Sequence, residues 1–377
     1  MKLKGTPLTA AILLLAAIGL AAMAGASFMA MWKDDVLVPA PGFEKKMLSD
    51  WFDGLAGSPG DTPVYVQQGG EPGGTVLILG GTHPTEPASM VAATLFLERA
   101  EVVKGRLIVI PQANMLGFTH NSPQEAHPQS ISFEAPDGSR RVFRFGSRLT
   151  NPLYEWPAPD IYIHPASGQQ LPGKERGNIN RCYPGIPDGS VTEQAAYAIT
   201  EMIKIEGVDL SIDLHEASPE YPVVNAIVAH ERSMELAAMT TMDLEMAGIP
   251  MRLEPSPKNL RGLTHREWGD YTDTMPVLME AGNPVQGRLR GRTDERLALT
   301  GEDKAYVKAA GLGRLYIPYD GDQRIEYRVG RHVASIMVFL ENLDLLEPDK
   351  GVLLEGIPSF DDLQEKGVGA FLSPMEL

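Results

Sequence analysis

The sequence contains a single cysteine, Cys182, among its 377 residues. One cysteine excludes an intrachain disulfide and any zinc site built from several thiolates. Basic residues are also few, because 33 Lys and Arg stand against 49 Asp and Glu, for a formal net charge of −16. Such an acidic surface repels phosphate backbones, so we expect no nucleic-acid partner. A transition-metal site in this chain would therefore rely mainly on histidines and carboxylates.

Charged residues are absent from a long segment near the N-terminus. Two lysines precede the uncharged residues 5–32, and Lys-Asp-Asp follows them. Roughly 28 residues are enough for a helix to cross a hydrocarbon core of about 30 Å. We therefore predict that residues 1–35 form a transmembrane anchor, with the following domain on the extracytoplasmic side because the lysines come first. Ala-Met-Ala and Ala-Gly-Ala offer cleavage sites, so a removed signal segment is the alternative.

Apolar strands and helices alternate from about residue 63 onward. "GTVLILGG", "EPASMVAATLFLERA" and "GRLIVIPQAN" predict a strand, a helix and a second strand of one βαβ unit. Later segments continue the alternation and end in a long helix, "RIEYRVGRHVASIMVFLENLDLL". The expected fold is a single α/β domain over residues 36–350, with a mixed, largely buried central sheet flanked by helices. Residues 351–377 are expected to form a short C-terminal tail.

Two segments lack this alternation. Residues 36–62 contain Pro and Gly, and "FEKKMLSDWFDGL" within them predicts a short helix. Residues 118–175 are rich in Pro, Ser, Asn and aromatic residues, and we expect a hairpin within "SISFEAPDGSRRVFRFGSRLTNP". A stretch of this length without strong periodicity is usually functional loop material or an insertion.

Histidines lie at the ends of two predicted buried strands. The first strand runs into "GGTHPTE", which places His83 and Glu86 on one turn, and the second, "SIDLHEAS", ends at His215. Two histidines and one glutamate form the ligand set of a catalytic zinc that keeps an open position. Asp213 and Glu216 lie near enough in sequence to orient such a ligand histidine. A polar strand end and a histidine capping a turn are the alternatives.

Two further motifs carry candidate catalytic groups. Glu280 ends the apolar run "PVLM", and a carboxylate in that position is costly unless it is paired or functional. Beside an activated water it would act as a general base. The loop "KERGNINRCYPG" holds Arg176, Asn180 and Arg181, and arginine binds carboxylates in a bidentate manner. A surface ion pair and an ordinary charged loop are the alternatives for these two motifs.

Together the motifs resemble those of the zinc carboxypeptidase-like hydrolases, in the branch of the succinylglutamate desuccinylases and aspartoacylases. "GGTHPTE" is similar to the family's Gly-Gly-x-His-x-x-Glu metal motif, and "NINR" to its Asp-Leu-Asn-Arg substrate motif. "DLHEA" resembles the segment of the second metal histidine, and "MEAGNPVQG" that of the catalytic glutamate. The four motifs span residues 75–291 in the family's order.

The resemblance implies a role for each motif residue. The expected roles are one Zn²⁺ ion bound by His83, Glu86 and His215, a general base at Glu280, a substrate-carboxylate site at Asn180 and Arg181, and a carbonyl-polarising arginine at Arg176. The Asp of the family's motif is Asn178 here, which would change the charge beside the metal ligands.

The implied activity is hydrolysis of an amide or ester bond in a small carboxylate-bearing substrate such as an N-acyl amino acid. A metallocarboxypeptidase acting on peptides outside the cytoplasm, including cell-wall peptides, is the second hypothesis. A non-enzymatic envelope binding protein that keeps the fold is the third. The membrane would be a further partner through residues 1–35.

Overall fold

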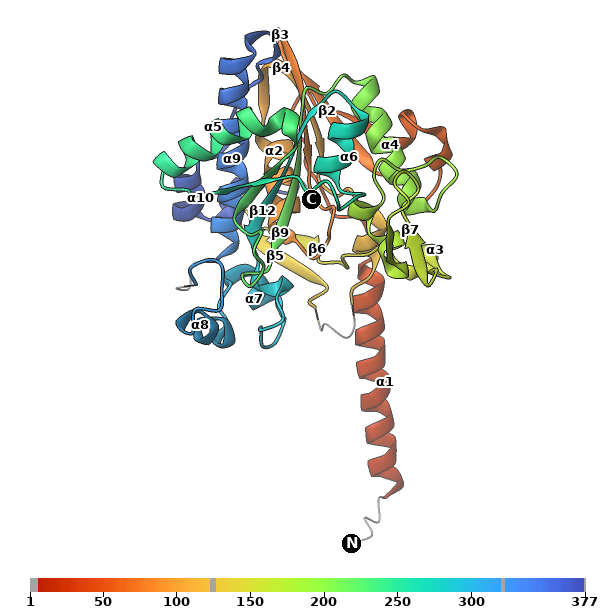
Figure 1. Ribbon diagram of the computed structural model, residues 1–377. Coiled ribbons are helices and arrows are strands. Elements are labelled where there is room, and N and C mark those ends of the chain that lie inside the picture. The colour runs from red at the N-terminus through yellow and green to blue at the C-terminus, as the bar shows by residue number, and fades with distance from the viewer. Residues whose placement is uncertain (1–5, 123–126, 320–322, 376–377) are drawn as a thin grey trace.

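The computed structural model describes residues 6–122, 127–319 and 323–375, and within these residues a nine-stranded mixed sheet forms the centre (Figure 1). Its strands run in the order β1-β2-β4-β3-β9-β12-β10-β11, and β13 pairs with β4. Their bounds are β1 Glu44–Met47, β2 Pro63–Gln68, β3 Glu71–Leu79, β4 Glu101–Ile110, β9 Leu210–Ala217, β10 Ala226–Ala229, β11 Arg252–Pro255, β12 Met275–Gly282 and β13 Leu353–Glu355.

Four neighbouring strands, β4, β3, β9 and β12, are parallel and form the buried middle of the sheet. Side chains alternate between the two faces of each strand. In β3, Val76 and Ile78 join one apolar cluster, whereas Leu77 and Leu79 join the other. The continuous apolar run in the sequence is therefore explained by burial on both faces.

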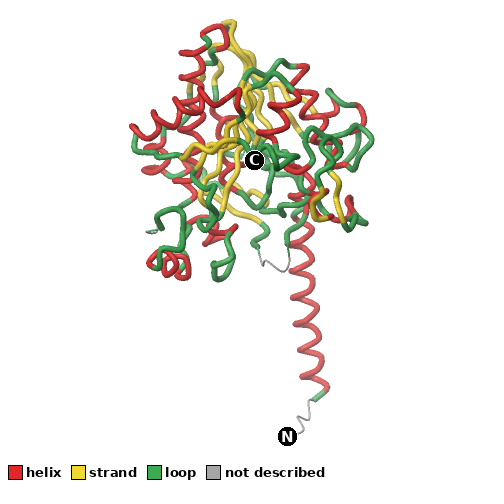
Figure 2. The backbone as a smooth tube through the Cα atoms, viewed as in Figure 1, coloured by secondary structure: helices red, strands yellow, loops and turns green. Residues whose placement is uncertain are grey.

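Helices cover both faces of this sheet, as Figure 2 shows. The first cluster contains side chains of α2 (Pro87–Arg99), α5 (Met234–Met246), α9 (Ile325–Leu346) and α10 (Phe360–Lys366). The second contains side chains of α4 (Val191–Ile205) and α6 (Thr264–Tyr271). The predicted α/β architecture, with a mixed central sheet between helices, is confirmed.

Residues 118–175 carry more structure than a bare loop. The expected hairpin is present as β5 (Ser130–Glu134) and β6 (Arg140–Arg144). A one-turn helix, α3 (Pro152–Glu155), and a second hairpin, β7 (Ile161–Ile163) with β8 (Gln170–Pro172), follow it. Two further short helices, α7 (Glu295–Thr300) and α8 (Lys304–Gly311), come after β12.

Two segments differ from the sequence-based expectation. "FEKKMLSDWFDGL" does not form an α-helix, because residues 44–47 pair with β2 and two short 3₁₀ turns follow. Residues 351–375 are not a detached tail. Their strand β13 pairs with β4, α10 packs against α9, and Leu363 and Leu372 are fully buried. In both segments, pairing with a sheet edge and burial of a few apolar side chains determine the structure.

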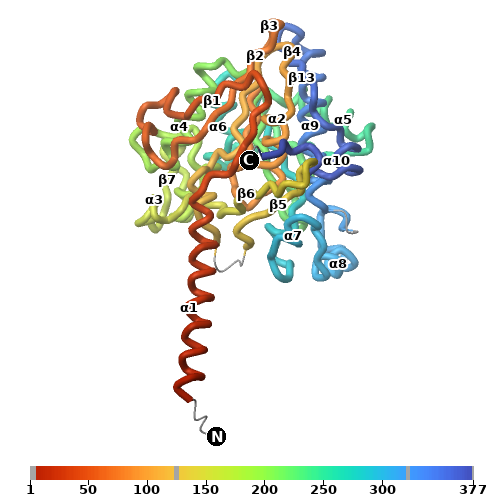
Figure 3. The backbone as a smooth tube through the Cα atoms, turned by 180° about the vertical axis from the view of Figure 1, so that it is seen from behind, coloured from red at the N-terminus to blue at the C-terminus, as the bar shows by residue number. Residues whose placement is uncertain are grey.

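One apolar helix, α1 (Pro7–Ala30), projects away from the domain (Figures 1 and 3). None of its residues is buried, and by length and composition it is able to cross a membrane. A signal sequence would have the same properties. The two lysines that predict its orientation, Lys2 and Lys4, lie outside the described residues.

Candidate metal centre and catalytic cavity

The turn after β3 places His83 and Glu86 at the carboxyl edge of the sheet. Gly81 has a φ of +65°, and a Cβ atom there would lie 2.7 Å from the carbonyl oxygen of Pro111. Only glycine accepts this backbone at low cost. Glu86 is the N-cap residue of α2, and Pro87 occupies the first turn, where its missing N–H costs nothing. Backbone geometry thus fixes both candidate ligands.

His215 and Glu280 lie side by side on neighbouring parallel strands. Glu280 of β12 is the register partner of His215 in β9. Register partners on adjacent strands point to the same face, so the two side chains share one surface of the sheet. The pairing of β9 with β3 brings this surface to the turn that carries His83 and Glu86. Strand order therefore unites residues that are far apart in the sequence.

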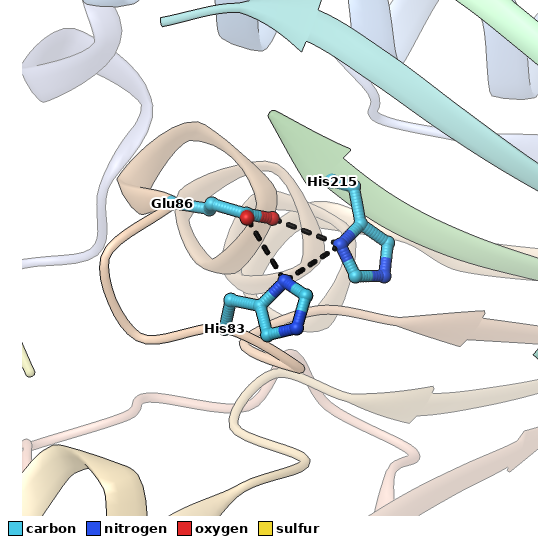
Figure 4. Close-up of side chains that lie close together, drawn as sticks. All are labelled: His83, Glu86 and His215. Atoms are coloured by element: carbon cyan, nitrogen blue, oxygen red, sulfur yellow. Dashed lines mark hydrogen bonds and ion pairs between the residues drawn. The ribbon is translucent and has the colours of Figure 1, made fainter. Parts of the chain in front are cut away.

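Three buried side chains converge on one point, as Figure 4 shows. Nδ1 of His83 lies 2.9 Å from Oε1 of Glu86, and Nδ1 of His215 lies 2.9 Å from Oε2. The two Nδ1 atoms are 3.1 Å apart. One candidate ligand atom from each of His83, Glu86 and His215 lies within 4.8 Å of the other two. This spacing allows one cation to contact all three residues.

The outer ring nitrogens show which atoms carry protons. Nε2 of His215 lies 2.7 Å from Oδ2 of Asp213, which is an acceptor when ionised. Nε2 of His83 lies 2.9 Å from Oδ1 of Asn178, which also accepts the backbone N–H of Asn180 at 3.2 Å. Each Nε2 is therefore a donor, so a neutral ring would carry its lone pair on Nδ1, facing the centre. Neutral histidines would thus present only acceptors to the centre.

The pKa values show that this centre favours positive charge. Burial and the nearby Arg148 charge lower the pKa of His83 to about 4, so this ring is neutral near pH 7. Burial acts to lower the pKa of His215, but the charges of Asp213 and Glu86 outweigh it and raise that pKa to about 10. Without a metal, the centre therefore holds a proton on His215. A divalent cation fits the same donor set.

A buried ion pair between Glu216 and Arg328 lies next to Glu86. The backbone N–H of Glu216 donates to Oε2 of Glu86 at 3.0 Å. The Glu216 carboxylate accepts a hydrogen bond from Ala88 N at the start of α2, at 2.8 Å, and from Arg328 of α9 at 2.5 Å. Burial raises the pKa of Glu216 to about 7, with Arg328 acting in the opposite direction. This contact places Glu216 behind the centre.

A cavity of about 500 Å³ lies beside the three converging side chains. Glu280 lines it, and its Oε2 atom is buried without a hydrogen-bond partner among the described residues. Burial raises the pKa of Glu280 to about 8, which suits a group that exchanges protons near neutral pH. The lining also contains apolar residues, namely Val223, Val228, Pro255, Leu260, Leu263 and Leu278.

Asn180 and Arg181 both line the cavity. Asn180 accepts the backbone N–H of Thr264 at 2.9 Å, and its amide nitrogen lies 3.3 Å from Nε2 of His215. Arg181 donates to the carbonyl oxygen of Asn180 at 2.6 Å. The loop therefore contributes both residues to the lining of the cavity, beside His215.

The structure does not bring Arg176 to the cavity. Its guanidinium donates to the Glu155 carboxylate at 3.1 Å and to the carbonyl oxygen of Glu155 at 2.6 Å. Arg148, which the sequence motifs do not single out, lines the cavity instead and donates to Oε1 of Glu86 at 3.1 Å. Arg176 therefore lies away from the cavity that its predicted role requires, whereas Arg148 lies in the lining. A second residue missed from sequence is His265, which lines the same cavity.

Comparison with known proteins places these observations in context. The chain matches no protein-family model. It is 27% identical over 170 residues to the N-alpha-acetyl-L-2,4-diaminobutyric acid deacetylase of Halomonas elongata, an alignment that covers 45% of this chain and 35% of that protein. The chain thus spans about a third of the length of this curated relative.

Solved structures of low identity are also similar to the chain. A succinylglutamate desuccinylase from Silicibacter sp. TM1040 is 20% identical, with a TM-score of 0.38 over 60% of this chain and 55% of that chain. A metallo-carboxypeptidase from Burkholderia cenocepacia is 11% identical, with a TM-score of 0.44 over 81% and 66%. The proteins that this chain resembles are thus desuccinylase/aspartoacylase members, a deacetylase of that branch and carboxypeptidase-type proteins, as the four motifs indicated.

Proposed function

We propose that this protein is a zinc-dependent hydrolase that cleaves an amide or ester bond in a carboxylate-bearing substrate such as an N-acyl amino acid. The convergence of His83, Glu86 and His215 beside the cavity supports this proposal most directly. Both histidines offer an unprotonated Nδ1 to the centre when a cation replaces the proton. The curated relative's name, a deacetylase of an acetylated amino acid, agrees with this substrate class.

The bound zinc would acidify a water molecule and polarise the scissile carbonyl. Glu280 accepts the proton of the attacking water at Oε2, the atom that otherwise lacks a partner. It then delivers that proton to the leaving amine. The strand register that pairs Glu280 with His215 keeps the base beside the metal ligands.

Two arginines and an asparagine bind the substrate and stabilise the developing negative charge in this proposal. Arg181 and Asn180 bind the substrate carboxylate, because both line the cavity next to His215. Arg148 stabilises the negative charge that develops on the carbonyl oxygen, because its guanidinium already contacts the ligand Glu86. Asn178 orients His83 as a neutral acceptor in place of the family's aspartate. The imidazole of His83 is then less basic than a carboxylate partner would make it.

We propose that α1 is retained and anchors the protein in a membrane, with the catalytic domain on the extracytoplasmic side. The helix has 24 residues, carries no charge and buries none of its side chains in the domain. Its length matches a hydrocarbon core of about 30 Å.

A carboxypeptidase acting on peptides is the second candidate function. The apolar residues that line the cavity of about 500 Å³ favour it. Leu260, Leu263 and Leu278 would contact an apolar side chain of a C-terminal residue. Both candidates use the same metal ligands and the same base.

The test uses the full chain in detergent, loaded with zinc. Hydrolysis of N-acetyl and N-succinyl amino acids is compared with release of C-terminal Leu or Phe from N-blocked dipeptides. Glu280→Gln should lower kcat by about 10²- to 10⁴-fold on the preferred substrate. Glu341→Gln changes an exposed carboxylate on α9 in the same way and should leave kcat unchanged. Equal kcat values for the two variants would eliminate Glu280 as the base.

A further inference from the structure

An unusual set of exposed apolar side chains lies on α3 and β7. Leu153 is 68% exposed and Trp156 is 78% exposed. In β7, Ile161 and Ile163 are more than half exposed, whereas the residue between them points inward. Large apolar side chains gathered on one surface mark an interaction site more often than single ones do. We call Leu153, Trp156, Ile161 and Ile163 the α3–β7 patch.

The two elements that carry the patch are held close together. Both α3 and β7 pack against the 3₁₀ turn at residues 173–177. Arg176 of this turn donates to carbonyl oxygens of Glu155 and Pro157, and Gly173 N donates to Asp160 O at 3.1 Å. The ion pair that removes Arg176 from the cavity thus holds α3 beside β7. Figures 1 and 3 show the two elements together.

The patch lies where α1 leaves the domain. The ring of Trp32, two residues beyond α1, is 6.4 Å from the ring of Tyr154 in α3. Figures 1 and 3 both show α3 and β7 at the level of the upper end of α1. If α1 spans a bilayer, the surface of that bilayer meets the domain at this level. Tryptophan is enriched at membrane interfaces because its ring is amphipathic.

The connection between α1 and the domain is well fixed. Met31, next after α1, is buried, and its carbonyl oxygen accepts a hydrogen bond from Arg144 at 3.2 Å. Oδ1 of Asp35 accepts the backbone N–H of Arg144 at 3.0 Å and lies 3.4 Å from its guanidinium. These contacts hold the first residues after α1 against strand β6. The side of the domain that faces the bilayer is therefore set by the fold.

Positive charge gathers at the same end of this acidic protein. The exposed basic residues of the α7–α8 region are Arg288, Arg292, Arg296, Lys304, Lys308 and Arg314. Figures 1 and 3 show α7 and α8 on the side of the domain toward which α1 projects. Residues 288–314 hold seven basic and four acidic residues, whereas the chain as a whole carries a net charge of −16. Basic residues near a bilayer attract anionic lipids.

We propose that the catalytic domain rests on the phospholipid bilayer that α1 spans, with the α3–β7 patch inserted at the interface and the α7–α8 basic segment near anionic headgroups. This proposal rests on the proposed anchor. α3 begins four residues after Arg148 in the chain, so this contact also lies near the cavity. The substrate would then be reached close to the membrane surface.

Spin labels on single introduced cysteines test the proposal in the full chain, reconstituted in nanodiscs with and without anionic lipid. The native Cys182 is fully buried, so introduced cysteines are labelled selectively. Labels at Leu153→Cys and Ile163→Cys report the patch, and a label at Leu14→Cys reports the first half of α1. Met246→Cys, 79% exposed on α5, is the matched control away from α1. Accessibility to oxygen is compared with accessibility to a water-soluble nickel complex.

We expect high oxygen and low nickel accessibility at Leu14, intermediate values at Leu153 and Ile163, and water-like values at Met246. Anionic lipid should raise the oxygen accessibility of the two patch labels relative to their nickel accessibility. The double substitution Lys304→Glu and Lys308→Glu should remove that effect. Water-like values at Leu14 would overturn both the anchor and the patch. High oxygen accessibility at Leu14 together with water-like values at Leu153 and Ile163 would overturn membrane insertion of the patch but not the anchor. Patch labels shielded from both reagents would show a second protein copy there, which also overturns it.

Discussion

Replacing Asp213 with asparagine tests whether the Asp213 charge strengthens His215 as the proposed metal ligand. Oδ2 of Asp213 accepts hydrogen bonds from Nε2 of His215 and from the Thr264 hydroxyl, both at 2.7 Å, and Oδ1 accepts one from Thr82 at 2.8 Å. An asparagine that keeps its oxygen toward His215 still satisfies the ring. Its amide nitrogen then donates to the Thr82 hydroxyl, which also accepts hydrogen bonds.

The expected effect is a loss of metal affinity without loss of the fold. The substitution removes the negative charge that makes His215 a stronger ligand. Changes of this kind beside a ligand histidine weaken metal binding by about 10- to 100-fold. That range corresponds to about 1.4–2.8 kcal/mol. A reduction near the upper end is expected because Asp213 is fully buried and therefore little screened by water.

Competition with a chromophoric chelator measures the zinc affinity of wild type and Asp213→Asn at one pH. Thr82→Val is the matched control, because it removes one hydrogen bond to Asp213 and keeps the carboxylate charge. This control should bind zinc nearly as tightly as wild type. Equal zinc affinity for Asp213→Asn and wild type would refute the role given to the Asp213 charge, as would an equal loss in both variants.

Three further outcomes follow from the structure. Arg148→Met should lower kcat by about 10²- to 10³-fold, whereas Arg176→Met, outside the cavity, should change kcat little. Steady-state kinetics on the preferred substrate measure both variants. A larger loss of kcat in Arg176→Met than in Arg148→Met would refute the proposed role of Arg148. In metal-free protein, burial raises the pKa of Glu280 from 4.5 to about 8, so its stabilisation is complete below pH 4.5 and is lost as the pH rises through 8. The free energy of unfolding of Glu280→Gln should therefore fall less between pH 5 and 8 than that of wild type. The difference is about 1.4 kcal/mol for every tenfold change in the proton affinity of the Glu280 carboxyl. Urea-denaturation profiles against pH that run parallel for the two proteins would contradict this. Arg328→Met leaves Glu216 buried without its cation and should cost about 3–5 kcal/mol in urea denaturation; a loss below about 1 kcal/mol would show that the pair is not buried as described.

The sequence predicts the converging ligands because each one follows a recognisable buried strand. β3 and β9 are parallel neighbours, so His83 and His215 come to one edge of the sheet. Glu280 is found for the same reason, since β12 pairs with β9 in parallel. Local pattern and the rule that ligands gather at the carboxyl ends of strands are sufficient here.

The arginine near the metal centre could not be predicted in the same way. Arg148 contacts Glu86 across 62 residues from a loop without periodicity, so no local pattern reveals it. Arg176 is near Arg181 in sequence, but its ion pair with Glu155 turns it away from the cavity. Both results depend on how the long segment 118–175 folds over the sheet. Tertiary contacts, rather than local secondary-structure propensity, determine the positions of the two arginines.

The edges of the fold are unpredictable for a related reason. Residues 44–47 have a charged, helix-compatible composition, but pairing with β2 makes them a strand. Edge strands are short and polar, so their pattern differs from that of buried strands. The short β13 gives an equally weak signal, although Leu354 is buried against the sheet. Central strands carry clear apolar runs, whereas these edges depend on their partners.

Zinc stoichiometry in the full-length protein tests the central claim most directly. Wild type should bind one zinc ion per chain, measured by titration of metal-free protein and by metal analysis after dialysis. His83→Ala and His215→Ala should each lose tight binding, because each removes one of the converging ligand atoms. His120→Ala changes a half-buried histidine outside the cavity and should retain one zinc. One tightly bound zinc in His83→Ala and in His215→Ala would contradict the metal centre.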